Sequence, residues 1–220
     1  MGIYGTVAYQ ILQNLGLTMT TASESSVLLK SDPIFIAILG SLYLKERLSA
    51  KQVAGIAMSF SGVLVIIFRG GSGGVSLSPA ALLGDLLALG GAISWALFSV
   101  YGKKVMKKTS AYDLTAYSSL FGATGLAPLA LGLERFALPS TATGWGTLIF
   151  LGLGASGLAY LLWFVALRGV SAYEAGISLF FTPLVAIVAA SIFLGEKIDL
   201  MFGIGAALVV LGMLITTKSK

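Results

Sequence analysis

DPIFIAILGSLYLKERLSAKQVAGIAMSFSGVLVI (residues 32–66) and TPLVAIVAASIFLGEKIDLMFGIGAALVVLGMLI (residues 182–215) are two copies of one pattern. A shift of the chain by 150 residues against itself aligns residues 2–67 with 152–217 without a gap. In this register identical residues coincide at several special positions: Pro33 with Pro183, Glu46 with Glu196, Gly55 with Gly205 and Gly62 with Gly212. Shared apolar composition alone does not align Pro, Glu and Gly together, so we interpret the pattern as an internal repeat.

The composition around these copies indicates a membrane protein. Of 220 residues, 57% are hydrophobic and only 10% are charged, and the mean hydropathy is +0.95. Soluble domains carry about 25% charged residues, so this chain lacks the charge to cover a water-facing surface. The chain has no Cys and no His, which excludes disulfides, thiol chemistry, haem ligation and the usual zinc sites. We therefore expect no cofactor and no metal site.

The charge-free stretches predict an all-α integral membrane protein with about eight transmembrane helices. A helix of about 18 or more apolar residues spans the hydrocarbon layer, and lipid permits only helices or closed barrels. Barrel strands would alternate polar and apolar residues, whereas stretches such as 186–194 are apolar on all sides. The predicted spans are 2–17, 24–44, 50–68, 82–102, 112–132, 146–167, 174–194 and 199–217.

The distribution of Lys and Arg predicts the orientation. One side of the predicted bundle collects Lys45, Arg47, Lys51, Lys103, Lys104, Lys107, Lys108, Arg168, Lys218 and Lys220. The opposite side collects Arg69, Arg135 and Lys197. The positive-inside rule assigns the richer side to the cytoplasm, so we expect a multi-pass protein of the plasma or inner membrane with both termini cytoplasmic. The net charge of +5 is then a topology signal, and we expect no nucleic-acid partner.

The two copies face opposite sides of the membrane in this topology. Glu46 lies in a loop on the basic side, and its equivalent Glu196 lies in a loop on the other side. Inverted duplication is typical of secondary transporters, whose substrate site lies near the midplane between the copies. Residues 1–68 hold three spans and residues 82–217 hold five. We therefore interpret the chain as an incomplete first repeat followed by a complete second one, with two spans and the start of a third expected ahead of residue 1.

With these residues in place, the chain resembles the drug/metabolite transporter superfamily, EamA type. The resemblance rests on the two Pro-centred spans, each followed by a Glu-bearing loop and a Gly-rich span (32–66 and 182–215), and on GDLLALGGAISWALFSVYGKK at 84–104. It implies ten spans in two five-helix domains, cytoplasmic termini, and export or exchange of small metabolites or drugs.

Lys30, Asp32 and Pro33 interrupt the second predicted span. A charge inside a membrane helix costs about 2.5–3.5 kcal/mol on insertion scales, so it normally faces a cavity or a partner. Asp32 then carries a proton or contacts a cationic substrate, and Lys30 attracts an anionic one; alternatively, both are neutralised by neighbouring helices. Pro33 and Pro183 are predicted to kink their helices and free a carbonyl for a ligand, or to serve packing alone.

Further polar and aromatic side chains are candidates for lining a substrate pathway. Gln10 and Asn14 lie four residues apart, on one face of the first span. Trp95 and Ser99, Tyr117, and Tyr160 and Trp163 come from three later spans and are candidates for an aromatic cage. Packing and anchoring at the membrane interface are the alternatives for the aromatic residues.

Other motifs are better explained by structure. Glu46 and Glu196 are expected to cap helices or to pair with their neighbours Arg47 and Lys197. The sequence GLGASG at 152–157 matches G-x-G-x-x-G, but no strand precedes it, so we interpret its glycines, with Gly122 and Gly125, as close-packing positions. No nucleophile–base pair is visible, and we expect neither catalytic residues nor enzymatic activity.

The sequence thus predicts a secondary transporter that works in the lipid bilayer on a small-molecule substrate. A proton or a counter-substrate gradient is expected to drive it. The alternative is a non-transporting membrane subunit, or a truncated fragment of a ten-span permease. A homo- or hetero-oligomeric state is left open.

Overall fold

In the computed structural model, residues 3–20, 25, 28–68, 78–133, 139–194 and 200–217 are described, and every regular element among them is a helix. The all-α expectation is therefore confirmed. The first half contains the π-helical η1 (Ile3–Ala8), α1 (Tyr9–Met19), α3 (Asp32–Leu44) and α4 (Ala50–Phe68). The second contains α5 (Pro79–Val105), α6 (Ala111–Leu133), α7 (Ala142–Ile149), π-helical η2 (Phe150–Leu158), α8 (Ala159–Gly169), α9 (Ala172–Ser178), the 3-10 turn η3 (Leu179–Phe181), α10 (Thr182–Leu194) and α11 (Leu200–Thr217).

Several of these helices have the length and composition of membrane spans. Among the described residues, Pro79–Val105, Ala111–Gly132, Ala142–Gly169 and Leu200–Thr217 are long and apolar enough to cross a bilayer. Asp32–Leu44, Ala50–Ile66 and Ala172–Val185 are shorter apolar helices. The outer surface is apolar as well, since Phe150 is 68% and Leu153 is 72% exposed. A surface of this kind requires lipid around it.

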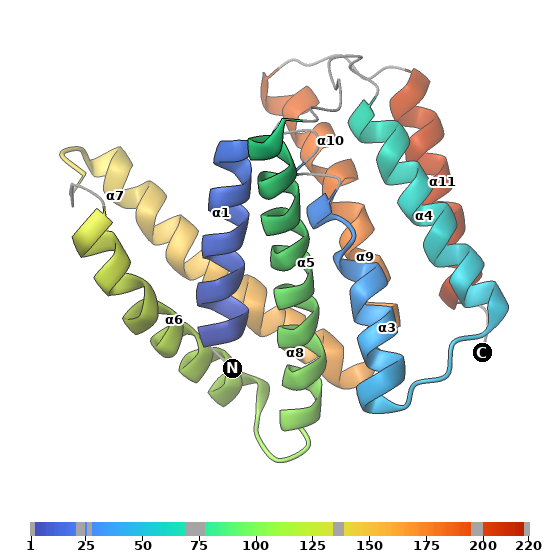
Figure 1. Ribbon diagram of the computed structural model, residues 1–220, viewed down its shortest axis with the longest axis horizontal. Coiled ribbons are helices and arrows are strands. Elements are labelled where there is room, and N and C mark those ends of the chain that lie inside the picture. Colours follow the sequence, from blue (N-terminus) through green and yellow to red (C-terminus); the bar gives the residue numbers. More distant parts are fainter. Residues whose placement is uncertain are drawn as a thin grey trace.

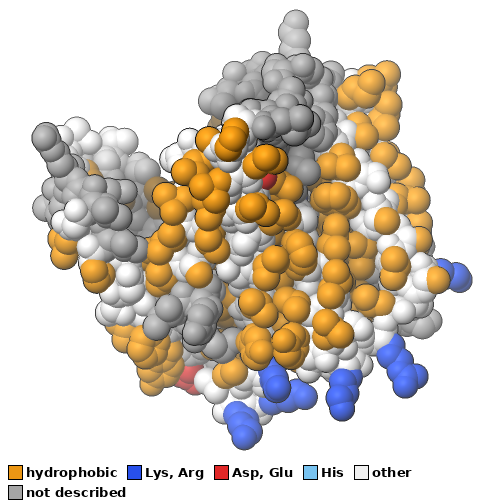
Figure 2. All heavy atoms as spheres, viewed as in Figure 1, with side chains coloured by type: hydrophobic (Ala, Val, Ile, Leu, Met, Phe, Trp, Pro, Cys, Tyr) orange, Lys and Arg blue, Asp and Glu red, His pale blue; other side chains and the backbone are white. Residues whose placement is uncertain are grey.

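The helices stand side by side, with the basic residues at one end. α1 and α5 lie together at the centre of the view, α4 and α11 form one flank, and α6 with the α7–α8 helix forms the other (Figure 1). Lys and Arg side chains gather along the lower edge, below a broad hydrophobic surface (Figure 2). We call this lower edge the basic end. The poorer set, Arg69, Arg135 and Lys197, lies outside the described residues, as do Lys218 and Lys220.

The repeat is visible in the bounds of the elements. The α-helix after each π-helical segment begins at Tyr9 in the first copy and at Ala159 in the second. α3 and α10 likewise begin at Asp32 and Thr182 and end at Leu44 and Leu194. These pairs are all 150 residues apart, so the same breaks in the helices occur at equivalent positions.

Pro33 and Pro183 mark two of these breaks. Each is the second residue of its helix, and at the start of α3 the missing N–H of Pro33 costs no intrahelical hydrogen bond. The chain before α3 is a turn at Lys30 and Ser31, and the chain before α10 is the 3-10 turn η3. The structure thus has an irregular turn next to each Pro, and the release of a carbonyl for a ligand stays a prediction.

Glycines let α4 and α11 pack antiparallel with their backbones in contact. A Cβ added to Gly55 would lie 2.5 Å from the Gly212 carbonyl oxygen, and one added to Gly62 would lie 2.6 Å from that of Gly205. In the 150-residue register Gly55 is equivalent to Gly205, and Gly62 is equivalent to Gly212. The two contacts are therefore equivalent to each other. The contact between these two helices therefore has approximate two-fold symmetry, and we call it the glycine seam.

The other glycines expected to allow close packing differ among themselves. A Cβ on Gly122 would lie 2.7 Å from the Thr6 side chain, and one on Gly125 would lie 2.7 Å from Val7, so α6 does pack closely on η1. Gly152, by contrast, has nothing within 4 Å of an added Cβ, and Gly154 meets only Phe150 of its own segment. Helix packing therefore does not explain these two glycines; they belong to the exposed π-helical segment η2.

Candidate functional site

Trp95 is the centre of an aromatic cluster between α1, α5 and α8. Its ring centroid lies 5.4 Å from that of Tyr9, 5.6 Å from that of Tyr160 and 5.8 Å from that of Trp163. Phe98 joins the group at 5.7 Å from Trp95 and 6.0 Å from Tyr160. Tilted pairs at these distances contribute about 0.5–1.5 kcal/mol each beyond burial. The cluster therefore forms a well-packed wall within the helix bundle.

Two hydrogen bonds that share the Ser99 hydroxyl link the polar groups of this cluster. The Ser99 hydroxyl, one turn from Trp95 on α5, donates to the Trp95 carbonyl oxygen at 2.9 Å. The same hydroxyl accepts a hydrogen bond of 3.1 Å from the indole N–H of Trp163. Within the part of the chain that the structure describes, the buried indole N–H of Trp95 has no hydrogen-bond partner. A buried donor without an acceptor is costly, so this N–H is a candidate for binding a polar group of a ligand.

Asp32 supplies a second unsatisfied polar group. It is the first residue of α3, is 8% exposed, and its Oδ1 has no hydrogen-bond partner among the residues that the structure describes. The phenol of Tyr9 lies within electrostatic range of both Asp32 and Tyr160, which connects the carboxylate with the aromatic cluster. An isolated buried carboxylate is strongly disfavoured unless a proton or a cation neutralises it. We call Asp32 with Tyr9, Trp95, Ser99, Tyr160 and Trp163 the central cluster.

The two repeats contribute to the central cluster in a related way. Tyr9 begins α1 directly after η1, and Tyr160 is the second residue of α8 directly after η2. Both tyrosines therefore lie where a π-helical segment changes into an α-helix, and such π segments occur frequently at functional sites. Each copy thus contributes one tyrosine from its π-to-α junction, and both tyrosine rings contact the ring of Trp95.

The structure brings together only some of the residues expected from the sequence. Asp32, Trp95, Ser99, Tyr160 and Trp163 lie in the central cluster, and Lys30 lies in the turn before α3, within electrostatic range of Asp32. The roles proposed for these residues remain predictions.

Three other expected residues lie elsewhere. Tyr117 is 60% exposed on α6, and its side chain makes none of the ring contacts of the cluster. Asn14 is exposed on α1, and Gln10 is half-buried. Sequence reasoning missed Tyr9 and Phe98, although Tyr9 adjoins Gln10 and Phe98 follows Trp95 by three residues, on the same face of α5.

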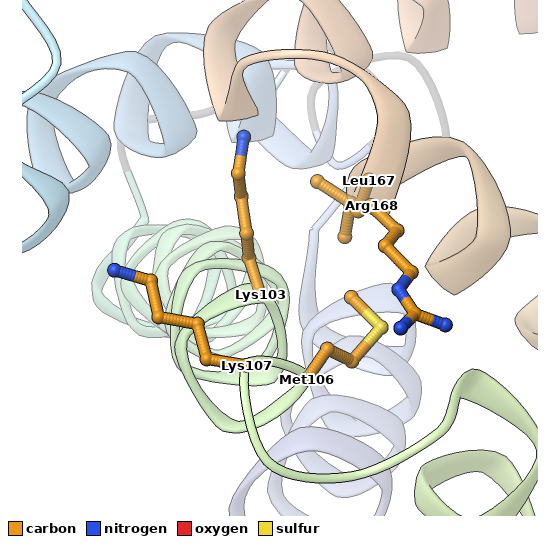
Figure 3. A pocket seen from close by; sticks show the side chains of 5 residues that line it. All are labelled: Lys103, Met106, Lys107, Leu167 and Arg168. Atoms are coloured by element: carbon orange, nitrogen blue, oxygen red, sulfur yellow. The ribbon is translucent and has the colours of Figure 1, made fainter.

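A pocket of about 270 Å³ lies at the basic end, lined by Lys103, Met106, Lys107, Leu167 and Arg168. In Figure 3 the amino groups of Lys103 and Lys107 point to different sides and away from Arg168. The charged ends do not converge on one point, so the pocket does not form a ligand site by itself. It marks the place where the ends of α5 and α8 meet.

Comparison with known proteins agrees with this architecture. The model of the EamA-like transporter family matches residues 1–68 and 82–218. A solved crystal structure superposes with a TM-score of 0.89 at 22% identity, covering 99% of this chain and 74% of the other, which supports the fold.

Named relatives cover the whole chain. An uncharacterized transporter of Archaeoglobus fulgidus is 29% identical over 220 residues, covering 100% of this chain and 76% of its own length. The uncharacterized transporter YyaM of Bacillus subtilis is 30% identical, and the match covers 97% of this chain and 70% of YyaM. A protein of Streptantibioticus cattleyicolor named "Probable terminal-alkyne amino-acid exporter" is 26% identical, and the match covers 99% of this chain and 71% of that protein. With most of its length matched by the family model, the chain belongs to the EamA-like transporter family.

Proposed function

We propose that this membrane transporter is a secondary transporter that exports or exchanges small metabolites or drugs past the central cluster. The observation that carries the proposal is the buried Asp32 carboxylate, whose Oδ1 has no hydrogen-bond partner among the described residues. It lies within electrostatic range of Tyr9, whose ring packs against that of Trp95. An unpaired carboxylate inside a membrane bundle is costly, and such residues typically mark ion or substrate pathways. We assign Asp32 as the proton carrier of the transport cycle.

Inverted repeats support movement of the substrate by alternating access. The two-fold glycine seam and the equivalent helix breaks relate residues 2–67 to 152–217. In such transporters one bundle rocks against the other around a midplane site. We regard residues 1–68 as an incomplete first repeat and residues 82–217 as a complete second one. A gradient of protons or of a counter-substrate supplies the energy.

The orientation belongs to the same proposal. The basic end collects the described Lys and Arg of the loops, which favours the cytoplasmic side of a plasma or inner membrane for this end and for both termini. The name of the Streptantibioticus relative, an amino-acid exporter, supports small polar metabolites as the first solutes to test.

The test is transport by the purified chain in liposomes that contain a trapped pH-sensitive dye. A panel of labelled amino acids, amines and nucleosides is offered with and without a proton gradient. We expect at least one solute to move protons with it, and Asp32→Asn to reduce gradient-driven flux at least about tenfold. Asp113→Asn is the matched control, because Asp113 bonds locally to Ser110 at the start of α6.

Two results would overturn the proposal. Gradient-driven flux that is unchanged in Asp32→Asn removes the proton-carrier assignment. Absence of flux for every solute, together with copurification of a membrane partner, favours the non-transporting subunit instead.

A further inference from the structure

We propose that Glu46 is a gating residue, and that the contacts of its carboxylate hold the basic end of the transport pathway closed in this conformation. Glu46 follows α3, and its carboxylate reaches the first residue of α9 and the last turn of α5. We call Glu46, Lys103 and the backbone at Val170 and Ala172 the carboxylate clasp. The inference rests on the proposed alternating access, since a gate has meaning only if the pathway opens to this end.

The chain is built locally to place Glu46 in this position. Lys45 adopts a left-handed conformation with φ 58°, which turns the chain back at the end of α3. The Glu46 N–H then donates to the Gly40 carbonyl oxygen at 3.3 Å. A Cβ on Gly40 would lie 3.2 Å from Glu46 Oε2 and 3.3 Å from Ala172 Cβ, so the small residue at position 40 leaves room for the clasp.

The carboxylate holds three chain segments together. Both of its oxygens accept from the Ala172 N–H at 2.9 Å, at the start of α9, where the helix dipole favours a negative charge. Lys103 Nζ donates to Glu46 Oε1 at 3.0 Å and also to the Val170 carbonyl oxygen. The Glu46 and Lys103 side chains are 15% and 20% exposed, so this ion pair is largely protected from water.

Other contacts join the first half of the chain to the second at the same end. The rings of Tyr43 on α3 and Tyr101 on α5 lie 5.4 Å apart. The Gln52 side-chain amide on α4 donates to the Tyr173 hydroxyl on α9 at 2.6 Å. Each of these pairs, like the clasp, joins a residue of the range 1–68 to one of the range 82–218.

The clasp lies at the basic end, beyond the central cluster. Lys103 follows Trp95 by eight residues on α5, or about 12 Å along the helix. Buried apolar side chains, Phe98, Val100, Phe164 and Leu167, occupy this interval. A solute leaving the cluster toward the basic end must therefore separate α3 from α5 and α9, and the clasp is what resists that separation.

The first experiment fixes the closed end without altering the clasp. The natural chain has no Cys, so Tyr43→Cys and Tyr101→Cys introduce the only thiols. A short, reducible bifunctional thiol reagent applied to the double variant in liposomes is expected to reduce solute flux at least about tenfold, and reduction is expected to restore it. The two single variants, treated alike, should keep their flux. Full flux in the cross-linked double variant would overturn the gate.

The second experiment opens the clasp and reads accessibility instead of transport. Ala175 is buried one turn beyond Ala172, in the same core cluster as Ile36 of α3. In an Ala175→Cys background, Glu46→Ala and Lys103→Met are expected to accelerate labelling by a water-soluble maleimide at least about fivefold. Asp113→Asn, which removes a carboxylate used only locally at this end, should leave the rate unchanged.

The outcomes separate the two proposals. Equal labelling rates in Glu46→Ala and its parent overturn the clasp as a gate, whatever the flux. Accelerated labelling in a chain that moves no solute retains the clasp as the closing contact of this end but refutes the transport function on which its gating role depends. If Glu46→Ala does not fold, the cross-linking experiment still decides, because Glu46 is intact there.

Discussion

The Ser59 hydroxyl on α4 donates a hydrogen bond of 3.1 Å to the Val209 carbonyl oxygen on α11, and these two residues are equivalent positions of the two copies. A contact between equivalent positions lies on the symmetry axis that relates the copies. The glycine pairs on either side of it are exchanged by the same axis. The seam between α4 and α11 is thus a tight, two-fold joint centred on Ser59 and Val209.

The glycine seam predicts a strong effect of the smallest possible substitution. In Gly212→Ala the new Cβ would meet the Gly55 carbonyl oxygen and the Ser59 backbone, so the helices must move apart. We expect a loss of about 1–3 kcal/mol in the free energy of unfolding, typical of overpacking. Gly203→Ala on the same helix meets nothing within 4 Å and should be neutral or stabilising by up to about 1 kcal/mol. Thermal unfolding in detergent measures both, and equal shifts would contradict the seam.

The two tryptophans of the central cluster predict opposite phenotypes for the same substitution. Trp163→Phe removes the N–H that bonds to Ser99, so it should cost about 1 kcal/mol more stability than Trp95→Phe, whose N–H has no hydrogen-bond partner among the described residues. Trp95→Phe should instead raise the KM for transport more. Unfolding temperatures and solute titrations of the two variants test this, and the reverse pattern would refute a role for the Trp95 N–H in substrate binding.

Tyr117 is predicted to be dispensable for transport. It is 60% exposed on α6 and makes no ring contact with the cluster, whereas Tyr160 contacts both Trp95 and Phe98. We expect flux within about twofold of wild type for Tyr117→Ala, since exposed substitutions rarely perturb a protein, and a reduction of at least about tenfold for Tyr160→Ala. Gel filtration confirms that each variant is folded. A large loss in Tyr117→Ala would return this residue to the pathway.

The topology predicts which loops meet which compartment. Lys107 and Thr141 are exposed residues beyond the two ends of α6, a helix long enough to cross the bilayer. In the cysteine-free chain, Lys107→Cys should react with an impermeant maleimide only from the cytoplasmic side, and Thr141→Cys only from the opposite side. Labelling of both positions from one side of intact cells would refute the arrangement.

Much of the fold was predictable because hydropathy and charge record it directly. The predicted span 50–68 agrees with Ala50–Phe68, and 199–217 agrees within one residue with Leu200–Thr217. The repeat register found from Pro33 and Gly55 reappears in the equivalent helix bounds. The π-helical segments were not predictable, because segments that are apolar on all sides show no periodicity to distinguish π from α.

Long-range partners were the other part that the sequence could not provide. Glu46 was expected to cap a helix or to pair with its neighbour Arg47. In the structure it accepts from the N–H of Ala172, the first residue of α9, and its ion-pair partner is Lys103, 57 residues away. Its equivalent Glu196 lies outside the described residues. Tyr117 was a candidate for the aromatic cage as well. Because α6 is apolar around most of its circumference, the sequence does not indicate which side of this helix faces the bundle.

The joint at Ser59 and Val209 has an energetic consequence for the direction of transport. In alternating access the two copies of an inverted repeat exchange conformations when the molecule turns from inward-facing to outward-facing. Two equivalent contacts, such as Gly55–Gly212 and Gly62–Gly205, then exchange as well, so their summed free energy is the same in both states. The two exchanged glycine pairs of the α4–α11 joint therefore favour neither orientation. Any bias toward one compartment must arise from parts of the molecule that break the symmetry, and from the solute and ion gradients across the membrane.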